Sequence, residues 1–458
     1  MNNEKTKNEN VSVIIGNPKK AIRKLAWPMI ISMFLTMAYN LADGIWVAGL
    51  GTDALAALGF VSPLFMIIIG LGSGLGAGAN SLIARSIGAN DKKTADNAAI
   101  HSLILSTIIS IILTIIILVF LKDILLFMGA GSTIDLALEY GYLVMGGLIV
   151  FILSNVGASI LRSEGDVNRA MYAMAITAIL NIVIDPIFIY TFNMGMAGAA
   201  WATLISASLS CAVIAYWLFI KKDTYLSFGK KDFKYDTKII KDLLNVGIPA
   251  SAEMFLISIL TILMNLVLVI VSGNEAVAIC TAGMRVINMG MIPHIGLGTA
   301  VLTVCGAAYG AKDYKKMLLG FNYSVKLGLI MSIITTVAFY IFAPQIAGIF
   351  TYTQSSSLLQ SGLIVFIQIT SLSLLPVPIG LIPISLFQGV GKGISALAMA
   401  VIREVIATAF FILLFTFVFT WAEIGVWWAL VLGSLVGSVV GYIWAKMYIS
   451  RLLKKESL

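Results

Sequence analysis

The stretch Tyr39-Asn40-Leu41-Ala42-Asp43-Gly44-Ile45-Trp46 lies inside the first long apolar run of the chain and contains the only charge of that run. A carboxylate at membrane depth costs several kcal/mol when it is left unpaired, so such a residue marks a functional site by default. A second stretch, Asn181-Ile182-Val183-Ile184-Asp185-Pro186, places another carboxylate in the fifth apolar run. Asp43 and Asp185 are therefore the first candidates for a functional site.

The composition around these carboxylates indicates a membrane protein. The chain has 458 residues, of which 59% are hydrophobic and 11% are charged, whereas about 25% of the residues of a soluble domain are charged. We therefore predict an all-α polytopic membrane protein. Cys211, Cys280 and Cys305 all lie in apolar runs, where their spacing fits neither a disulfide framework nor a metal site.

A membrane span needs about 20 apolar residues. Twelve runs satisfy this length, namely 26–49, 54–83, 97–120, 134–160, 170–192, 197–219, 246–271, 276–308, 319–342, 358–386, 394–420 and 424–445. The long runs 54–83, 134–160, 276–308 and 358–386 are expected to be tilted or kinked. Pro293, Pro376, Pro378 and Pro383 provide kink sites in two of them.

The basic residues predict the topology. With the N-terminus in the cytoplasm, 26 of the 30 Lys and Arg residues fall on the cytoplasmic side. The polar first residues lack the pattern of a cleaved signal or a transit peptide. We expect a multi-pass protein of the cytoplasmic (inner) membrane with both termini in the cytoplasm. The net charge of +8 follows this topology and is not a nucleic-acid signal.

The chain divides into two similar halves. Gly88-Ala89-Asn90-Asp91-Lys92-Lys93 recurs as Gly310-Ala311-Lys312-Asp313-Tyr314-Lys315, and Gly51 recurs as Gly273. Since each half has six spans, the repeat is parallel, with a pseudo-two-fold axis along the membrane normal, which is a known transporter architecture. We predict five regions: a cytoplasmic segment 1–25, an N-lobe 26–219, a cytoplasmic linker 220–245, a C-lobe 246–445 and a basic cytoplasmic tail 446–458.

Four polar side chains are predicted to lie in one layer of the N-lobe. At a rise of about 1.5 Å per residue, Asp43 and Asp185 lie roughly 12 Å below the outer boundary, and Tyr140 and Thr203 lie roughly 9 Å below it. Asn181 shares the helix face of Asp185, one turn deeper.

The alternative interpretation is that each polar residue merely joins two helices through hydrogen bonds, which is favoured for Tyr140, Thr203 and Asn181 taken singly. Two carboxylates in one small cavity cannot both ionise cheaply, so a proton or another cation must neutralise them. Carboxylate, amide and hydroxyl oxygens are suitable ligands for Na⁺. We predict a coupling-ion site, with H⁺ or Na⁺ and no other cofactor, at Asp43, Asn181, Asp185 and Thr203.

Other intramembrane polar residues carry weaker signals. Glu253 lies near the inner end of the seventh span, Arg403-Glu404 near the start of the eleventh favours a structural role, and Arg285 has no evident partner. The glycine-rich stretch 72–78 sits inside an apolar run and predicts close helix packing rather than a nucleotide loop. No G-x-x-x-x-G-K-[ST] motif is present, so ATP-driven transport is not expected.

The chain resembles the multidrug and toxic compound extrusion (MATE) transporters over essentially its whole length, and in particular the DinF-like branch of prokaryotes and archaea. The resemblance is carried by the stretches 39–46, 162–166 (RSEGD), 181–186, 198–203 and 386–391 (LFQGVG). It implies twelve helices in two six-helix lobes around a central cleft.

The resemblance also implies roles for individual residues. Asp43, Asn181, Asp185 and Thr203 correspond to the N-lobe cation site, Tyr140 and Asn155 to the N-lobe cavity, and Pro28 to a proline about which the first helix bends. We assign Tyr39 and Glu253 to the substrate cavity as well. The tenth run has no acid, which argues against a NorM-type cation site in the C-lobe.

These expectations describe a secondary antiporter and not an enzyme. It would export lipophilic or cationic organic compounds in exchange for H⁺ or Na⁺, in the bilayer, without nucleic-acid partners and as a monomer. A flippase for lipid-linked sugars is the alternative, which would need a more basic cleft. An intramembrane aspartyl protease would need a G-x-G-D motif that ends in one of its aspartates. Neither Asp43 nor Asp185 is preceded by such a sequence. The substrate and the choice of coupling ion are left open.

Overall fold

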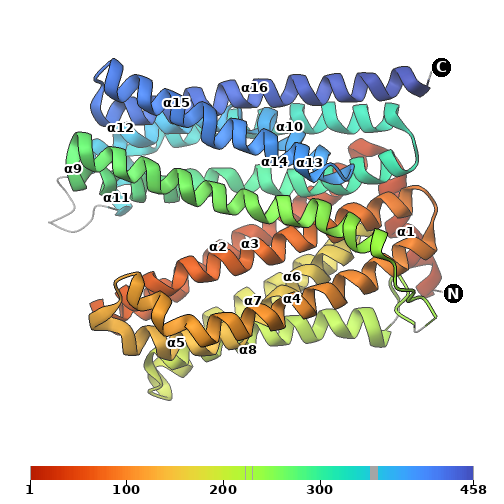
Figure 1. The fold of residues 1–458 in the computed structure, drawn as a ribbon, viewed down its shortest axis with the longest axis horizontal. Helices are drawn as coiled ribbons and strands as arrows, with labels where there is room; N and C mark the ends of the chain where they lie inside the picture. The colour runs from red at the N-terminus through yellow and green to blue at the C-terminus, as the bar shows by residue number, and fades with distance from the viewer. Residues whose placement is uncertain (1, 222, 230, 351–358, 457–458) are drawn as a thin grey trace. The chain divides into compact units, whose positions relative to one another are not determined.

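The computed structural model describes residues 2–221, 223–229, 231–350 and 359–456, and this part of the chain is all-α (Figure 1). The long helices of the first half are α2 (Pro18–Ala48), α3 (Thr52–Gly88), α4 (Lys92–Phe127), α5 (Ile134–Gly146), α6 (Leu148–Ser163), α7 (Val167–Pro186) and α8 (Gly195–Ala215), preceded by α1 (Asn2–Ile15). The second half contains α9 (Thr237–Gly310), α10 (Tyr314–Ile341), α11 (Ala343–Phe350), α12 (Gln360–Ser371), α13 (Val377–Gly389), α14 (Gly393–Ala400), α15 (Thr408–Leu413) and α16 (Ala422–Glu456). Lys222, Lys230 and the first residue of the predicted run 358–386 lie outside the described residues.

The described helices supply twelve candidate membrane spans, and α1 and α11 belong to none of them. Over the described residues, nine helices are long and apolar enough to cross a bilayer, and two further spans are bent helix pairs. The ninth helix, α9, has 74 residues, about 110 Å at 1.5 Å per residue, which is too long for one crossing of a core of about 30 Å. It is interrupted at Gly273, where φ is 76° and ψ is −169°, so it supplies two spans. The all-α, multi-span fold is as predicted.

Two of the four long runs that were expected to tilt or kink are bent. Helices α5 and α6 meet at Gly147 with an angle of 46°, and α12 and α13 meet near Pro376 with an angle of 47°. The run 54–83 is instead one continuous helix, and α9 continues through Pro293 without a break. A proline cannot make one of the backbone hydrogen bonds of the helix, and a kink at Pro293 within the continuous α9 stays a prediction.

The repeat detected in the sequence is reproduced in the backbone. Asn90 and Lys312 both have a positive φ, of 58° and 57°, immediately before an aspartate that caps the next helix. The Asp91 carboxylate accepts a hydrogen bond from the Thr94 N–H, and the Asp313 carboxylate accepts one from the Lys316 N–H in α10. These short polar side chains satisfy N–H groups that lack a partner within the helix.

The chain forms two compact units, residues 1–17 with 27–251 and residues 18–26 with 252–458. Each unit has its own buried apolar core. In the first unit, glycines of α3 allow neighbouring helices to approach closely. A Cβ added at Gly74 would lie 2.5 Å from the carbonyl oxygen of Gly247, and one at Gly76 would lie 2.4 Å from the hydroxyl of Ser159. The glycine-rich stretch is thus a packing surface, as the sequence predicts.

Candidate cation and substrate site

The candidate site lies within the first unit and is built on α2, α5, α7 and α8. Pro186 ends α7 directly after Asp185, and the chain continues as wider, π-type turns over Ile187–Thr191. Helix α8 packs against this segment at Gly198, where an added Cβ would lie 2.7 Å from the carbonyl carbon of Phe188. Only glycine permits this approach, which sets α8, and with it Thr203, beside α7.

Asp185, Asn181 and Thr203 form a hydrogen-bonded chain across α7 and α8. The Asn181 amide nitrogen donates to Oδ1 of Asp185 and to Oγ1 of Thr203, at 3.2 Å each. The Thr203 hydroxyl also lies 3.0 Å from the carbonyl oxygen of Ala199, to which it donates. Asp185 is 0% exposed and Asn181 is 1% exposed, so this chain of polar groups is removed from bulk solvent.

Asp43 and two tyrosines complete the group. The charge of Asp43 acts on Asp185, and the charges of both carboxylates act on the phenols of Tyr39 and Tyr140. The Tyr140 phenol is also hydrogen-bonded to Thr203. The group therefore contains the five side chains that the sequence predicts in or beside one layer, and Tyr39 as a sixth. The five are Asp43, Tyr140, Asn181, Asp185 and Thr203.

Three oxygens of this group have no hydrogen-bond partner within the described part of the chain, namely Oδ1 of Asp43, Oδ1 of Asn181 and Oδ2 of Asp185. Buried polar atoms are seldom left in this state without a functional reason. All three are oxygens, and with the Thr203 hydroxyl they make the donor set that a hard cation such as Na⁺ requires. A proton on one carboxylate would equally satisfy part of the group.

The remaining candidate residues lie elsewhere. Asn155 is on α6, and its amide nitrogen lies 3.4 Å from the Ser73 hydroxyl of α3. Pro28 is a partly buried residue inside α2. Glu253 belongs to the second unit, where its carboxylate accepts a hydrogen bond of 3.4 Å from the Gln388 amide. Arg285 is exposed.

Glu253 is part of a polar cluster that sequence reasoning did not assemble. The buried guanidinium of Arg403 pairs with Glu404, and both charges act on Glu253. Gly437 makes room for Arg403, since a Cβ there would lie 2.3 Å from its Cα. The sequence favours a structural role for Arg403-Glu404, which stays a prediction. The contacts that bring Glu253 and Gln388 together depend on helix packing that a single sequence does not reveal.

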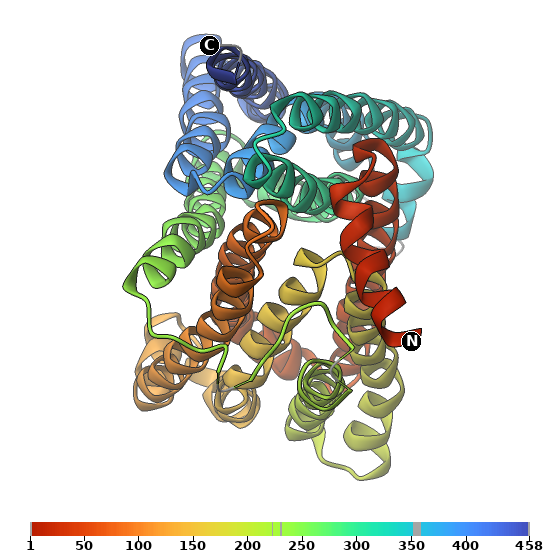
Figure 2. The same ribbon diagram turned by 90° about the vertical axis from the view of Figure 1, so that its right-hand side faces the viewer.

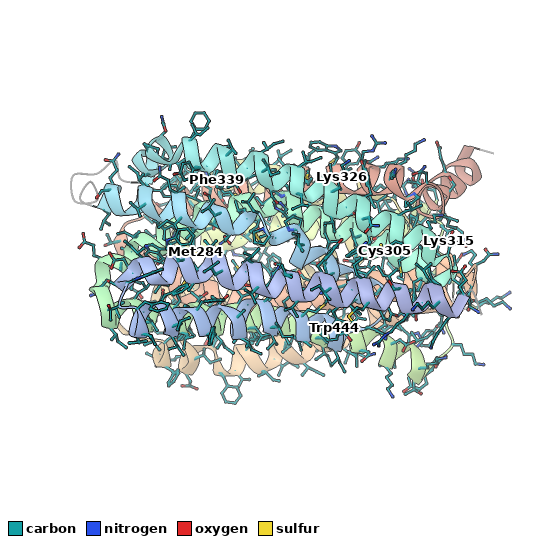
Figure 3. The ribbon with its side chains drawn as sticks, turned by 90° about the horizontal axis from the view of Figure 1, so that it is seen from above. Met284, Cys305, Lys315, Lys326, Phe339 and Trp444 are labelled. Carbon is teal, nitrogen blue, oxygen red and sulfur yellow. The ribbon has the colours of Figure 1, made fainter. Side chains whose placement is uncertain are left out.

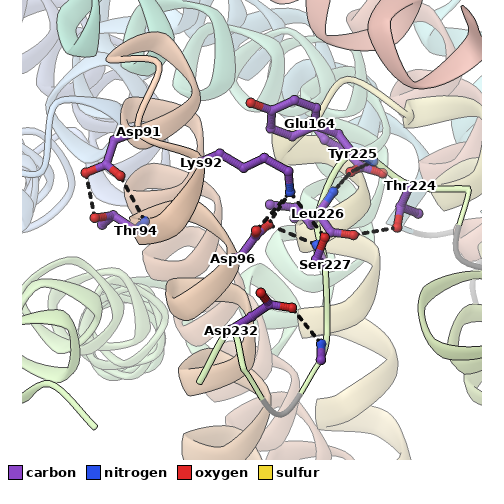
Figure 4. Close-up of polar contacts among 11 residues, drawn as sticks. Asp91, Lys92, Thr94, Asp96, Glu164, Thr224, Tyr225, Leu226, Ser227 and Asp232 are labelled. Atoms are coloured by element: carbon purple, nitrogen blue, oxygen red, sulfur yellow. Dashed lines mark hydrogen bonds and ion pairs between the residues drawn. The ribbon is translucent and has the colours of Figure 1, made fainter. Parts of the chain in front are cut away.

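A second polar network, also not anticipated, anchors the linker to the first unit (Figure 4). The Glu164 carboxylate accepts hydrogen bonds from the backbone N–H groups of Tyr225 and Leu226, at 2.9 and 3.2 Å. Asp96 accepts from Lys92 and from the Ser227 N–H. The linker lies across the end of the unit at which the N-terminal helix α1 is also found (Figure 2).

Burial governs the ionisation of this network. It raises the pKa of Glu164 to about 8, with a further contribution from the negative charge of Asp166. Burial also pushes the pKa of Asp223 upward, but the hydrogen bonds from Arg169 and Lys221 hold it below its usual value. Arg169 binds Asp223 through both terminal nitrogens, at 2.8 and 2.6 Å, which is the strong bidentate geometry.

Comparison with known proteins identifies the family. The MatE family model matches residues 28–187 and 249–413. The chain is 27% identical over 340 residues to the probable multidrug resistance protein NorM of Thermotoga maritima, covering 73% of this chain and 72% of that protein. It is 26% identical over 424 residues to the multidrug export protein MepA of Staphylococcus aureus strain N315, covering 91% and 90%.

A solved structure is more similar still. It is that of a MOP superfamily transporter from Pyrococcus furiosus, for which reverse polarity of the binding pocket is said to suggest a different function. The sequence identity is 41% and the TM-score 0.94, over 97% of this chain and 98% of that one. From the family model and these similarities, the chain belongs to the MatE family, and it is a multi-pass membrane transporter rather than an enzyme.

Proposed function

We propose that this protein is a multidrug efflux antiporter that exports lipophilic or cationic organic compounds and is coupled to H⁺ or Na⁺ at Asp43 and Asp185. The observation that carries the proposal is the buried Asp185 carboxylate, which is held by Asn181, is acted on by the charge of Asp43 and keeps one oxygen without a partner. Two carboxylates that interact at such a position need a neutralising cation.

The residues of the site have different roles in the proposed transport cycle. Asp43 and Asp185 receive the proton or the Na⁺, and Asn181 and Thr203 orient Asp185 and add oxygen ligands. Neutralisation removes the charge that acts on Tyr39 and Tyr140, which changes the interactions of α2 and α5 with the cavity. A cation that binds one conformation better than the other shifts the equilibrium between them by that difference in affinity. This differential binding couples cation entry to drug release.

The substrate class is supported by the two relatives named for multidrug resistance and export. The protein would work in the cytoplasmic membrane as a monomer, with both termini in the cytoplasm, as the distribution of basic residues favours. The Pyrococcus furiosus transporter is a reason to include an anionic substrate in the assay. We do not favour a flippase for lipid-linked sugars, because basic residues within spans are few.

The test is transport in sealed proteoliposomes with a pH gradient and a Na⁺ gradient imposed separately. Efflux of a lipophilic cation should follow one of the two gradients and should be lost in Asp185→Asn. Exchange of an anionic compound alone would contradict the proposed substrate class. Transport that persists with neither gradient would contradict antiport.

A further inference from the structure

Helix α16 extends well beyond what a bilayer core requires. Its 35 residues span about 52 Å at 1.5 Å per residue, against a hydrocarbon core of about 30 Å. The final turns, which carry Lys446, Arg451, Lys454 and Lys455, therefore project past the apolar region. Trp444, seen on α16 in Figure 3, is an aromatic residue of the kind found at the boundary between membrane and water.

Two adjoining surface cavities lie along these turns. The first, of about 390 Å³, is lined by residues of α16 alone: Tyr442, Ile443, Lys446, Met447, Ser450, Arg451 and Lys454. The second, of about 320 Å³, lies between α16 and the α13–α14 turn, and is lined by Phe387, Lys392, Ser395, Trp444, Met447, Tyr448 and Arg451. Met447 and Arg451 line both cavities, so the two adjoin along these residues, and together they are called the groove below.

The groove keeps its positive charge. The Lys392 ammonium lies over the Tyr448 ring, 4.3 Å from its centroid, and the Lys446 ammonium lies 2.5 Å from the Asn322 amide oxygen and over the Tyr442 ring. These partners are neutral, so they position the two ammonium groups without cancelling their charge. Within the described part of the chain, Arg451 forms no ion pair.

An apolar path leads into the groove from the membrane side. Val436, Val440, Ile443 and Met447 are 41–51% exposed and follow one another at intervals of three or four residues, so they share one face of α16. The last two line the groove itself. A ligand that fits both parts has an apolar chain, which lies along the stripe, and an anionic head, which meets Lys392, Arg451 and the Ser395 hydroxyl.

We propose that this groove is a binding site for an anionic phospholipid, with the headgroup phosphate between Lys392 and Arg451 and an acyl chain along the stripe 436–447. A free phosphate ion would use the basic residues but not the apolar stripe. Basic side chains near the surface of an anionic membrane contribute about 1 kcal/mol each, which is about a fivefold change in affinity. The bound lipid would fix the end of α16 against the α13–α14 turn.

The experiment titrates the purified full-length protein in neutral detergent with short-chain phosphatidylglycerol and follows the melting temperature. Phosphatidylcholine of equal chain length and inorganic phosphate are titrated in parallel. Lys392→Gln and Arg451→Gln should each raise the phosphatidylglycerol concentration at half-maximal stabilisation about fivefold, and the double variant about 25-fold. The matched control is the double variant Lys312→Gln/Lys315→Gln, which removes two exposed basic residues of the same unit that line neither cavity and should change the midpoint less than twofold.

Three results would overturn the proposal. A wild-type midpoint in both single variants would show that these charges do not bind the headgroup. Equal stabilisation by phosphatidylcholine would show that an anionic head is not recognised. Equal stabilisation by inorganic phosphate would identify a free anion as the ligand. If the double variant does not fold, the two single variants decide the outcome, since both side chains are exposed and replaceable.

Discussion

The side-chain amide of Asn181 lies 3.2 Å from Oδ1 of Asp185, one helical turn along α7, and connects that carboxylate to Thr203 of α8. A neutral amide can support the carboxylate whether it is charged, protonated or bound to Na⁺, whereas a lysine or arginine would neutralise it permanently. This relationship leaves the charge of Asp185 available to a mobile cation.

Asp43→Asn and Asp185→Asn are each expected to abolish coupled efflux, and the double variant should be no worse than either single one. Residues that act as one unit give non-additive losses. The melting temperature should stay unchanged or rise, because a buried interacting pair of charges carries a desolvation cost. The measurements are proteoliposome efflux and thermal melting for the three variants. Normal efflux from Asp43→Asn would refute the coupling centre, and additive losses of stability would indicate separate structural roles.

Asn181→Ala should weaken the response to the coupling ion and destabilise the protein by about 1–3 kcal/mol, because it leaves Oδ1 of Asp185 without its donor. Thr203→Val keeps the side-chain volume but removes an oxygen. It should leave a proton-coupled transporter nearly intact, yet impair a Na⁺-coupled one, since only Na⁺ needs this ligand. The rate of efflux, measured as a function of pH and of the Na⁺ concentration, distinguishes the two outcomes. The matched control is Thr299→Val, which changes an exposed threonine of α9.

The sequence predicted the fold well because hydrophobic length and basic flanks are local signals. It predicted the Asn181–Asp185 contact for the same reason, since four residues make one helical turn. Hydropathy marks where a helix meets lipid and not where it begins, so α2 starts at Pro18 rather than at residue 26. The contacts of Glu164 were not predictable from pattern, because its partners are backbone N–H groups that every non-proline residue possesses.

Pro28→Ala should slow transport while leaving expression and melting temperature close to wild type. Pro28 lies inside α2 and has no N–H, so a carbonyl one turn earlier lacks its usual partner and the helix can bend there. The chain also passes from one compact unit to the other beside it, between residues 26 and 27. Turnover and drug binding are measured separately. Unchanged turnover would assign Pro28 to simple tolerance of proline in a membrane helix, and Pro63→Ala in α3 serves as the control.

Cysteine labelling should establish the orientation. In a background without the three native cysteines, Asn274→Cys, beside the break at Gly273, should react with an impermeant maleimide added to intact cells. Lys93→Cys, in the first turn of α4, should react only after the membrane is permeabilised. Both side chains are exposed, so accessibility within the protein does not limit either reaction. Labelling of position 93 from outside would reverse the proposed topology.

Glu164→Gln should reduce the loss of stability that the wild-type protein shows between about pH 5 and pH 8. The folded protein holds the Glu164 proton up to a pKa of about 8, whereas the ordinary value is 4.5. In that interval the folded state binds more protons than the unfolded state, so the free energy of unfolding falls as the pH rises. Above pH 8 the buried carboxylate is ionised, and the N–H groups of Tyr225 and Leu226, with the charge of Arg169, offset part of its desolvation. Melting temperatures are compared at pH 5.5 and pH 8.5. Asp91→Asn is the control: it alters an exposed cap whose pKa is lowered by the Thr94 hydroxyl and N–H, so it should shift both temperatures equally. An equal pH dependence in Glu164→Gln and wild type would show that Glu164 does not control the anchoring of the linker.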